Sequence, residues 1–413
     1  MSKIILAINA GSSSVKISVY SANQSEAPKQ LAEAQIDGLT APPPKLKYTR
    51  GDTKVEKDKK LPDNIKDQES AFKYILDRLV EDKDLKEVSS KDDIAIACHR
   101  VVHGGDYNEA KVINRDTYHH LEALTDLAPL HNASALAIIK SCHETLPKTH
   151  NVAYFDSQFH QSIPEHIRTY PIDQEIAKKN KLRKYGFHGI SYAFIIRSVA
   201  DFRGKRAEET SIIALHLGSG ASACAIKNGK SWDTSMGLTP LAGLPGATRS
   251  GNIDPSLVFH YASNVGKLSP SSTDSLHIST AEEIMNKKAG WKALAGTTDF
   301  GTISTSDDPA CKLAFDILVD RICGYIGQYY VSLNGKVDAL VFAGGIGEKS
   351  TELRKRVVAQ CECLGFKLDK TANEANISEV VQDISGEKRI LVCQTDEQFE
   401  MARGVTENES LWN

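Results

Sequence analysis

The chain has 413 residues, 41% of them hydrophobic and 25% charged, which is typical of a globular protein with about two domains. A formal net charge of −3 excludes a global positive field that would recruit nucleic acid or an anionic membrane. The apolar run after Met1 is too short for an export signal, and no run approaches the ~20 residues of a membrane-spanning helix. The eight scattered cysteines fit a reducing compartment, so we expect a cytoplasmic protein without nucleic-acid or membrane partners.

Two segments share one pattern of an apolar strand, a turn of small residues and a second strand. They cover Ile4–Ile17 and Ile212–Ala223, and their glycines Gly11 and Gly218 stand about half the chain apart. Unrelated glycine turns are common, but this spacing favours a duplication in which each copy opens its own domain. Backbone N–H groups in such turns can form nests for phosphate. No G-x-x-x-x-G-K-[ST] motif occurs, which excludes a P-loop, and no complete G-x-G-x-x-G follows a strand.

The first half of the chain continues with an excursion and a strand that ends in polar residues. Ala41–Pro44 and the Lys-rich stretch after it predict an exposed excursion with edge strands. The apolar run Ile94–Cys98 predicts a strand, and His99–Gly105 follows it. Arg100 is placed to offer a planar fork to a carboxylate or phosphate, although a plain surface arginine is the alternative.

The middle of the chain carries several polar residues that are weak signals when taken singly. Asn132 is expected to cap a helix over Ala133–Glu144. Asp156 follows another strand and could simply cap a turn, and His188 lies between glycines, where a structural histidine is common. Arg249 lies in a long stretch rich in Gly, Pro, Ser and Thr, which in a compact domain is often a functional loop.

The last part of the chain predicts a helix, a strand and a glycine turn in succession. Apolar residues recur at near-helical spacing from Leu313 to Tyr329 and predict a long buried helix. The apolar run Ala339–Phe342 predicts a buried strand that leads into Ala343–Glu348, with a further helix from Ser350 onward. This turn is a natural place for a nucleotide, and close backbone packing explains it equally well. Cys361-Glu362-Cys363 lacks the second half of a zinc site.

In their order along the chain, these motifs make the sequence similar to the acetate kinases, and through them to the superfamily of sugar kinases, chaperone ATPases and actin. The resemblance extends from about Lys3 to Arg403. Its most specific marks are N-A-G-S-S-S-x-K at Asn9–Lys16, H-R-V-V-H-G-G at His99–Gly105, Y-G-F-H-G at Tyr185–Gly189, the segment Asp233–Pro255 and the G-I-G-E turn at Gly345–Glu348.

The resemblance implies an α/β fold of two duplicated ribonuclease H-like (actin-like ATPase) domains with an active-site cleft between them. The N-terminal domain would cover residues 1–155, with residues 390–413 returning to it. The C-terminal domain, residues 156–389, would carry the nucleotide site and the contact of a homodimer. The implied reaction is reversible, direct in-line transfer of the ATP γ-phosphoryl group to acetate, giving acetyl phosphate and ADP. It depends on Mg²⁺, for which Mn²⁺ can substitute.

The family's residue roles transfer to matching positions as implications of this resemblance. Asn9 and Glu397 would hold the metal ion and Lys16 would reach the nucleotide phosphates. Arg100 would bind the carboxylate, Arg249 and His188 would stabilise the transition state, and Asp156 would orient groups rather than act as a base. The acetate pocket would be lined by Val102, Leu130, Phe187 and Pro240. The nucleotide would contact His216, Leu217, Gly218, Ser219, Gly220, Asp299, Phe300, Gly301, Gly345, Ile346, Gly347, Glu348 and Lys349.

Four departures from the family pattern bear on the phosphoryl donor. Ser219 stands where the family usually has Asn, Asn252 where it has Asp, Gly301 where it has an Arg near the nucleotide base, and Lys349 where it has Asn. A pyrophosphate-dependent acetate kinase is therefore an alternative. A propionate or butyrate kinase, with the same machinery and a roomier pocket, is another. An ATP-driven conformational machine like the chaperones and actin is an alternative from another class.

Overall fold

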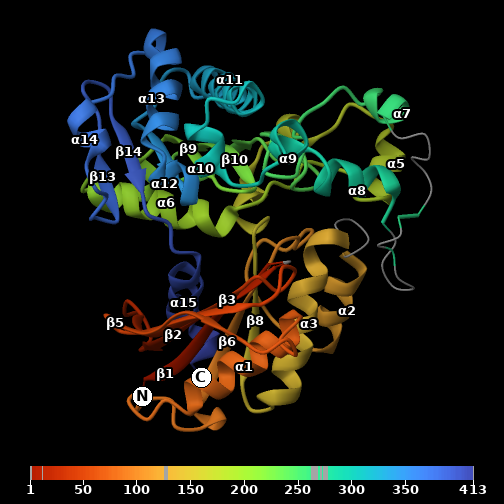
Figure 1. The fold of residues 1–413 in the computed structure, drawn as a ribbon, viewed down its shortest axis with the longest axis vertical. Coiled ribbons are helices and arrows are strands. Elements are labelled where there is room, and N and C mark those ends of the chain that lie inside the picture. The colour runs from red at the N-terminus through yellow and green to blue at the C-terminus, as the bar shows by residue number, and fades with distance from the viewer. Residues whose placement is uncertain are drawn as a thin grey trace. The chain divides into compact units, whose positions relative to one another are not determined.

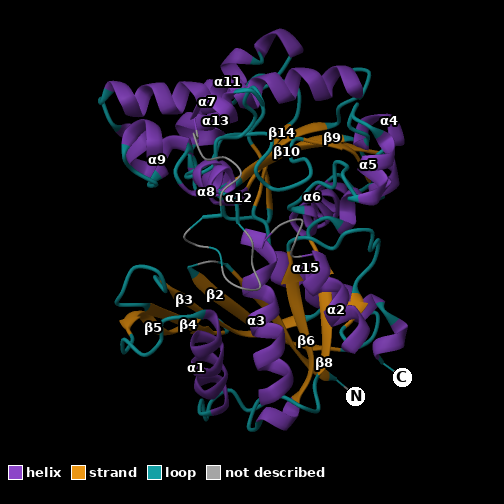
Figure 2. Ribbon diagram, turned by 90° about the vertical axis from the view of Figure 1, so that its right-hand side faces the viewer, coloured by secondary structure: helices purple, strands orange, loops and turns teal. Residues whose placement is uncertain are grey.

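The computed structural model describes residues 2–11, 13–124, 129–261, 268–269, 272 and 278–412, with only the backbone for 129–131 and 260–261. The chain divides into two compact units, Met1–Gln158 with Asp396–Asn413, and Phe159–Thr395. Each unit contains one mixed β-sheet with helices on its faces (Figures 1 and 2). None of the helices in the described part of the chain has the length and apolar character needed to cross a bilayer.

The sheet of the first unit has the strand order β5-β4-β3-β2-β1-β6-β8-β7. Strands β1 to β5 form an antiparallel meander, and β6 and β8 continue the sheet parallel to β1. The strands are β1 (Lys3–Ala10), β2 (Ser14–Ala22), β3 (Lys29–Asp37), β4 (Lys45–Arg50), β5 (Thr53–Lys60), β6 (Ile94–Val101), β7 (Lys111–Val112) and β8 (His150–Phe155).

Helices cover the two faces of this sheet because alternate strand residues point to opposite sides. Leu6 and Ile8 of β1 join one apolar core with Phe72 of α1 (Gln68–Val80) and Ile138 of α3 (Pro129–Thr145). On the other face, α15 (Glu397–Glu407) packs against β1, β2 and β6. The remaining elements of this unit are η1 (Lys91–Asp93), α2 (Arg115–Leu124), which packs on α3, and η5 (Glu409–Leu411).

The sheet of the second unit repeats the topology of the first. Its order is β11-β10-β9-β12-β14-β13. Strands β9 to β11 form an antiparallel meander, β12 is parallel to β9, and β14 is parallel to β12. The predicted duplication is therefore confirmed. These strands are β9 (Ile212–Leu217), β10 (Ala221–Lys227), β11 (Lys230–Thr234), β12 (Ala339–Ala343), β13 (Val381–Asp383) and β14 (Ile390–Cys393).

The long helix α11 (Pro309–Ser332) packs on β9 and β10, and α6 (Gly189–Phe202) packs on β9, β13 and β14. The prediction of a long helix here is confirmed, although Leu313 on its outer side is 53% exposed. The other helices of this unit are η2 (Gln158–Ser162), α4 (Glu165–Arg168), α5 (Gln174–Lys179), η3 (Ala207–Glu209), α7 (Leu257–Tyr261), α8 (Thr280–Lys287), α9 (Gly290–Ala295), α10 (Phe300–Thr305), α12 (Gly344–Lys349), α13 (Thr351–Gln360), η4 (Glu362–Leu364) and α14 (Lys370–Glu374).

Each sheet carries a helix that the chain forms after it leaves the other sheet. The chain leaves β8, passes through η2, α4 and α5 and then forms α6 on the second sheet, and it leaves β14 and forms α15 on the first sheet. The chain therefore returns to the first unit at Asp396 rather than at residue 390, because Ile390–Cys393 pair with β12. Likewise Asp156 lies in the first unit, since that unit extends to Gln158.

Two local expectations can be compared with the structure. The Lys-rich stretch forms β4 and the edge strand β5, as predicted, and lysines on an edge strand discourage pairing with other chains. The expected cap at Asn132 is wrong, because α3 already begins at Pro129 and Asn132 is buried inside the helix. Its amide accepts from His103 N at 2.9 Å and donates to His103 O at 3.0 Å. Proline at the first helical position favours the earlier start.

Candidate active site

In the first unit, four predicted residues meet at the carboxyl ends of the central strands. Asn9 lies near the end of β1 and Arg100 near the end of β6, beside each other because Ile8 pairs with His99 in the parallel register. Asp156 follows β8, the neighbour of β6, and its N–H donates to Val101 O at 3.1 Å. Glu397 is the first residue of α15.

Arg100 is the centre of this group. Its Nε donates to Asp156 Oδ1 at 3.1 Å, its Nη2 to Asp156 Oδ2 at 2.6 Å, and its Nη1 to Asn9 Oδ1 at 3.1 Å. Glu397 Oε2 lies 3.5 Å from Arg100 Nε and accepts from Asn9 Nδ2 at 3.1 Å. Burial by itself lowers the pKa of Arg100, but the carboxylates of Asp156 and Glu397 outweigh it and raise that pKa, so the guanidinium stays charged.

The Arg100 side chain is 18% exposed and that of Asp156 is 1% exposed. A guanidinium has five N–H donors, of which three are used by these hydrogen bonds within the described residues. Two N–H groups of a fixed cation are therefore left for an oxyanion. Both Asp156 oxygens accept from Arg100, so this carboxylate holds the guanidinium in place.

The turn after β6 is also held rigidly. Gly104 N donates to Ser157 Oγ at 3.0 Å, and a Cβ at Gly104 would lie 2.4 Å from the Phe155 ring. Only glycine allows this approach. Half-buried Val102 is presented by this turn, whereas the side chain of Leu130, predicted for the same pocket, lies outside the described residues.

Lys16 is not drawn into the Arg100 group. It lies opposite Asn9 in the antiparallel register of β1 and β2, but its Nζ pairs with Glu33 Oε2 at 3.1 Å. Both side chains are about one third exposed, so this ion pair is weak and the amine can leave it for a phosphate.

In the second unit, His188 occupies an unusual backbone position. It precedes α6 with φ 58°, in the left-handed region that non-glycine residues seldom adopt. Its Nδ1 lies 2.9 Å from Ser222 Oγ, and its ring stacks on His216 with centroids 4.2 Å apart. His216 Nδ1 in turn lies 2.7 Å from Ser191 Oγ. The predicted histidines His188 and His216 are thus brought together.

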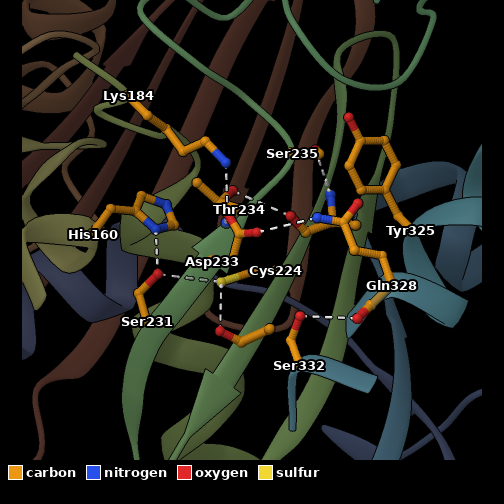
Figure 3. Close-up of polar contacts among 12 residues, drawn as sticks. His160, Lys184, Cys224, Ser231, Asp233, Thr234, Ser235, Tyr325, Gln328 and Ser332 are labelled. Atoms are coloured by element: carbon orange, nitrogen blue, oxygen red, sulfur yellow. Dashed lines mark hydrogen bonds and ion pairs between the residues drawn. The ribbon is translucent and has the colours of Figure 1, made fainter. Parts of the chain in front are cut away.

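Two buried contacts hold the segment that ends in His188. Lys184 Nζ pairs with Asp233 Oδ1 at 2.6 Å, and His160 Nδ1 lies 2.7 Å from Ser231 Oγ (Figure 3). The other ring nitrogen of His160, Nε2, lies 2.9 Å from Phe187 O. Because a carbonyl only accepts, His160 Nε2 carries the proton and Nδ1 accepts from Ser231. Burial lowers the pKa of His160 to about 4, so its imidazole is neutral. No motif in the sequence indicated this role of His160.

Arg249 lies against the turn between β9 and β10. A Cβ at Gly220 would lie 2.8 Å from Arg249 Nη1, so the guanidinium touches the backbone of this turn. Ala247 N donates to Ser219 O at 2.8 Å, which holds the Arg249 loop to the turn. Arg249 Nη1 also lies 3.4 Å from Pro240 O. The Arg249 cation therefore lies at a turn of small residues, which suits an anion.

The glycine cluster after β12 forms the short helix α12 and not an open turn. Gly344 adopts φ +73°, and a Cβ there would lie 2.7 Å from Leu217 O, so close packing requires this glycine. Arg354 is 1% exposed and donates to Gly347 O at 2.9 Å and Glu348 O at 2.8 Å, which fixes the end of α12. The role of Arg354 could not be seen in the sequence, because its neighbours along the chain are typical of a surface helix.

The three residues of the segment Asp299–Gly301 lie in different surroundings. Asp299 caps α10 by accepting from Gly301 N and Thr302 N, each at 3.1 Å. Phe300 packs on the apolar core, with its ring 5.7 Å from that of Trp291. Gly301 is exposed, and a Cβ there would meet only the Asp299 carboxylate, at 3.4 Å. This position has room for a large side chain.

Within the described ranges, no group of three or more His, Cys, Asp or Glu side chains is arranged to hold a metal ion by itself. Two sheets of the same topology, with polar residues at strand ends, define the class of actin-like ATPase folds.

The comparisons with known proteins identify the family within this class. The profile of the acetokinase family matches residues 4–403, so the chain belongs to this family. The probable acetate kinase of Neurospora crassa is 60% identical over 447 aligned residues, which cover 100% of this chain and 95% of that protein. The crystal structure of Porphyromonas gingivalis acetate kinase is 31% identical, with a TM-score of 0.81 over 100% of both chains. That of a propionate kinase from Francisella tularensis is 32% identical, with a TM-score of 0.82 over 97% of this chain and 98% of that one.

Proposed function

We propose that the protein is an acetate kinase that transfers the γ-phosphoryl group of ATP directly to acetate, reversibly, to give acetyl phosphate and ADP. The observation that carries the proposal is the Arg100 guanidinium, charged, largely buried and fixed by Asp156 and Asn9, with two N–H groups left for a substrate oxyanion. Membership of the acetokinase family and the names of the relatives support it.

Acetate needs no general base. A carboxylate with a pKa of roughly 4–5 is already ionised at neutral pH, so the barrier is repulsion between two anions. Cations that neutralise the transferring group lower this barrier. We assign this role to Arg100 and Arg249, with His188 as a further donor. Asp156 positions Arg100, because both of its oxygens already accept from that guanidinium.

The residues at the ends of β1 and α15 fit a magnesium ion. Asn9 Oδ1 and the Glu397 carboxylate are neighbouring oxygen donors, and their side chains are joined by a hydrogen bond of 3.1 Å. Mg²⁺ commonly takes one or two carboxylates and completes its shell with phosphate and water. Bound here, the ion would neutralise phosphate charge, and Mn²⁺ would serve in its place. The two side chains would keep their mutual orientation through this hydrogen bond.

We assign the nucleotide to the second unit. The β9–β10 turn with Arg249 suits the phosphates, and α12 with Asp299–Gly301 would contact the rest of the nucleotide. Lys16 would leave Glu33 for a phosphate. The acetate methyl group would face Val102, Leu130, Phe187 and Pro240. By analogy with the family we also propose a homodimer that works in the cytoplasm.

Propionate is a second candidate acceptor, because a propionate kinase is among the solved structures that this chain resembles. One methylene is worth only ~1–3 kcal/mol in a hydrophobic pocket, so propionate should be a slower substrate rather than an excluded one.

The test is acyl phosphate formation, trapped with hydroxylamine, from acetate or propionate with Mg²⁺ and ATP, GTP or pyrophosphate in parallel. We expect product with ATP and acetate, and less with propionate. Product with pyrophosphate alone would replace the nucleotide assignment. ATP hydrolysis that does not depend on acetate would instead support a conformational machine, and no product from folded protein would refute the proposal.

A further inference from the structure

Three of the eight cysteines line one cavity of about 620 Å³ in the second unit. Cys323 belongs to α11, while Cys361 and Cys363 stand at the end of α13 and in η4. The cavity opens beside Gly324 and Gln328 of α11, far in sequence from the C-x-C pair. None of these three residues has a part in the proposed phosphoryl transfer.

The thiols of Cys323 and Cys361 lie together. Val357 O accepts from Cys323 Sγ at 3.6 Å and from Cys361 N at 3.1 Å, so the two cysteines share one hydrogen-bond acceptor. Each side chain shifts the pKa of the other, which places the two thiols within interaction distance. Both pack on the same apolar core, with Cys361 only 3% exposed and Cys323 partly exposed at the cavity.

This arrangement differs from that of the other buried thiols. Burial alone raises the pKa of Cys142 to about 12, and burial with the Glu348 charge does the same for Cys393, which keeps both protonated and unreactive. The neighbouring Cys361 thiol lowers the pKa of Cys323, whereas Cys323 and burial raise the pKa of Cys361. Because Cys323 is also the one of the two that is partly exposed at the cavity, it is the thiol that an oxidant meets first.

We propose that Cys323 and Cys361 form a reversible disulfide with a low-molecular-weight disulfide, such as oxidised glutathione, as the oxidant. The cavity admits the oxidant to the exposed side of Cys323. The product would join α11 to the end of α13, the helix whose Arg354 fixes α12.

The exchange proceeds in two balanced steps. The Cys323 thiolate attacks one sulfur of the oxidant, whose sulfur–sulfur bond breaks, and the released thiolate takes up a proton. Cys361 then gives its proton to solvent and attacks the Cys323 sulfur of the mixed disulfide, which releases the second thiolate. Two protein thiols are oxidised to one disulfide, and one small disulfide is reduced to two thiols.

The test uses the intact, folded protein incubated with oxidised glutathione at neutral pH, then alkylated and digested without reductant for mass spectrometry. We expect a Cys323–Cys361 cross-linked peptide that dithiothreitol releases. Cys323→Ser and Cys361→Ser should each lose the cross-link, with glutathione retained on Cys323 in the latter. Cys363→Ser is the matched control from the same cavity and should keep it.

The mapping of the wild-type protein decides the question even if a variant does not fold. A Cys361–Cys363 link, glutathione on Cys363 alone, or complete alkylation of Cys323 and Cys361 after long incubation would each overturn the proposal.

Discussion

Replacing Arg100 with Ala should lower kcat by roughly 10²–10³ in a folded protein. Arg100 keeps two N–H groups for substrate, and a hydrogen bond to a charged group contributes about 1.5–3 kcal/mol. Removing a preorganised donor from a developing oxyanion typically costs about 2.7–4 kcal/mol. The loss of one to two hydrogen bonds to a charged group amounts to about 1.5–6 kcal/mol, and this span includes the cost of one such donor.

The substitution also has a cost in stability. Asp156 is 1% exposed and would lose its ion-pair partner. Removing one member of a buried pair costs about 3–5 kcal/mol, less where the carboxylate can become protonated. The first unit should therefore unfold at a lower temperature, and activity must be assayed well below that transition.

The control for this effect is Arg50→Ala. Arg50 Nη1 pairs with Asp82 at 2.6 Å, with side chains 23% and 6% exposed, so a similar ion pair is lost away from the site. We expect nearly normal kcat in this control. The assay measures hydroxamate formation at saturating acetate and ATP, with thermal unfolding of both variants. Near-normal kcat in Arg100→Ala, or an equal loss in Arg50→Ala, would refute the role of Arg100.

Three further predictions address the metal, the buried histidine and the nucleotide. Glu397→Gln should raise the half-saturating Mg²⁺ concentration at least ~10-fold in initial-rate assays, whereas Glu407→Gln on the same helix should not; equal values would exclude Glu397 as a ligand. His160 has a folded pKa of about 4, below its unfolded value, so the unfolded state binds more protons between pH 6.5 and 4. Stability should fall as pH drops through this window, by up to roughly 3 kcal/mol from this residue. In urea unfolding, His160→Gln should lose less stability than the wild type as pH falls through this window, and an equal loss would contradict the assignment. Its kcat should be nearly normal, since Gln can donate to Phe187 O, whereas His160→Ala should lower kcat. Gly301→Arg should lower the KM for ATP, and Gly301→Ala, which gains only helix propensity, should leave it unchanged; equal KM values would show that this position does not reach the base.

The sequence predicted the duplicated strands and turns well because their signals are local. Alternating or continuous apolar runs and small-residue turns identify β1, β2, β9 and β10 without any knowledge of the rest of the chain. The meeting of Asn9 and Arg100 depends instead on β1 and β6 being parallel neighbours, which the structure shows.

The supporting contacts could not be predicted because they join residues far apart in sequence. His160 and Ser231, or Arg354 and Asn373, meet only through the fold. Local rules also mislead where tertiary contacts decide, as at Asn132, whose amide bonds the turn of His103 instead of capping a helix. The glycines after β12 gave two open interpretations, and Gly344 is explained by packing against Leu217.

Both units use the same physical means to fix a side chain to which we assign a part in the phosphoryl transfer. Arg100 and His188 stand at element ends, and each is fixed by buried partners that do not themselves need to touch substrate. Phosphoryl transfer to an ionised carboxylate requires little covalent chemistry from the protein, so its rate depends on placing charge before the reaction begins. An ionised acetate has no proton for a base to remove, and both oxygens of Asp156 already accept hydrogen bonds from Arg100. The arrangement of Asp156 therefore favours electrostatic positioning over proton transfer as the source of catalysis.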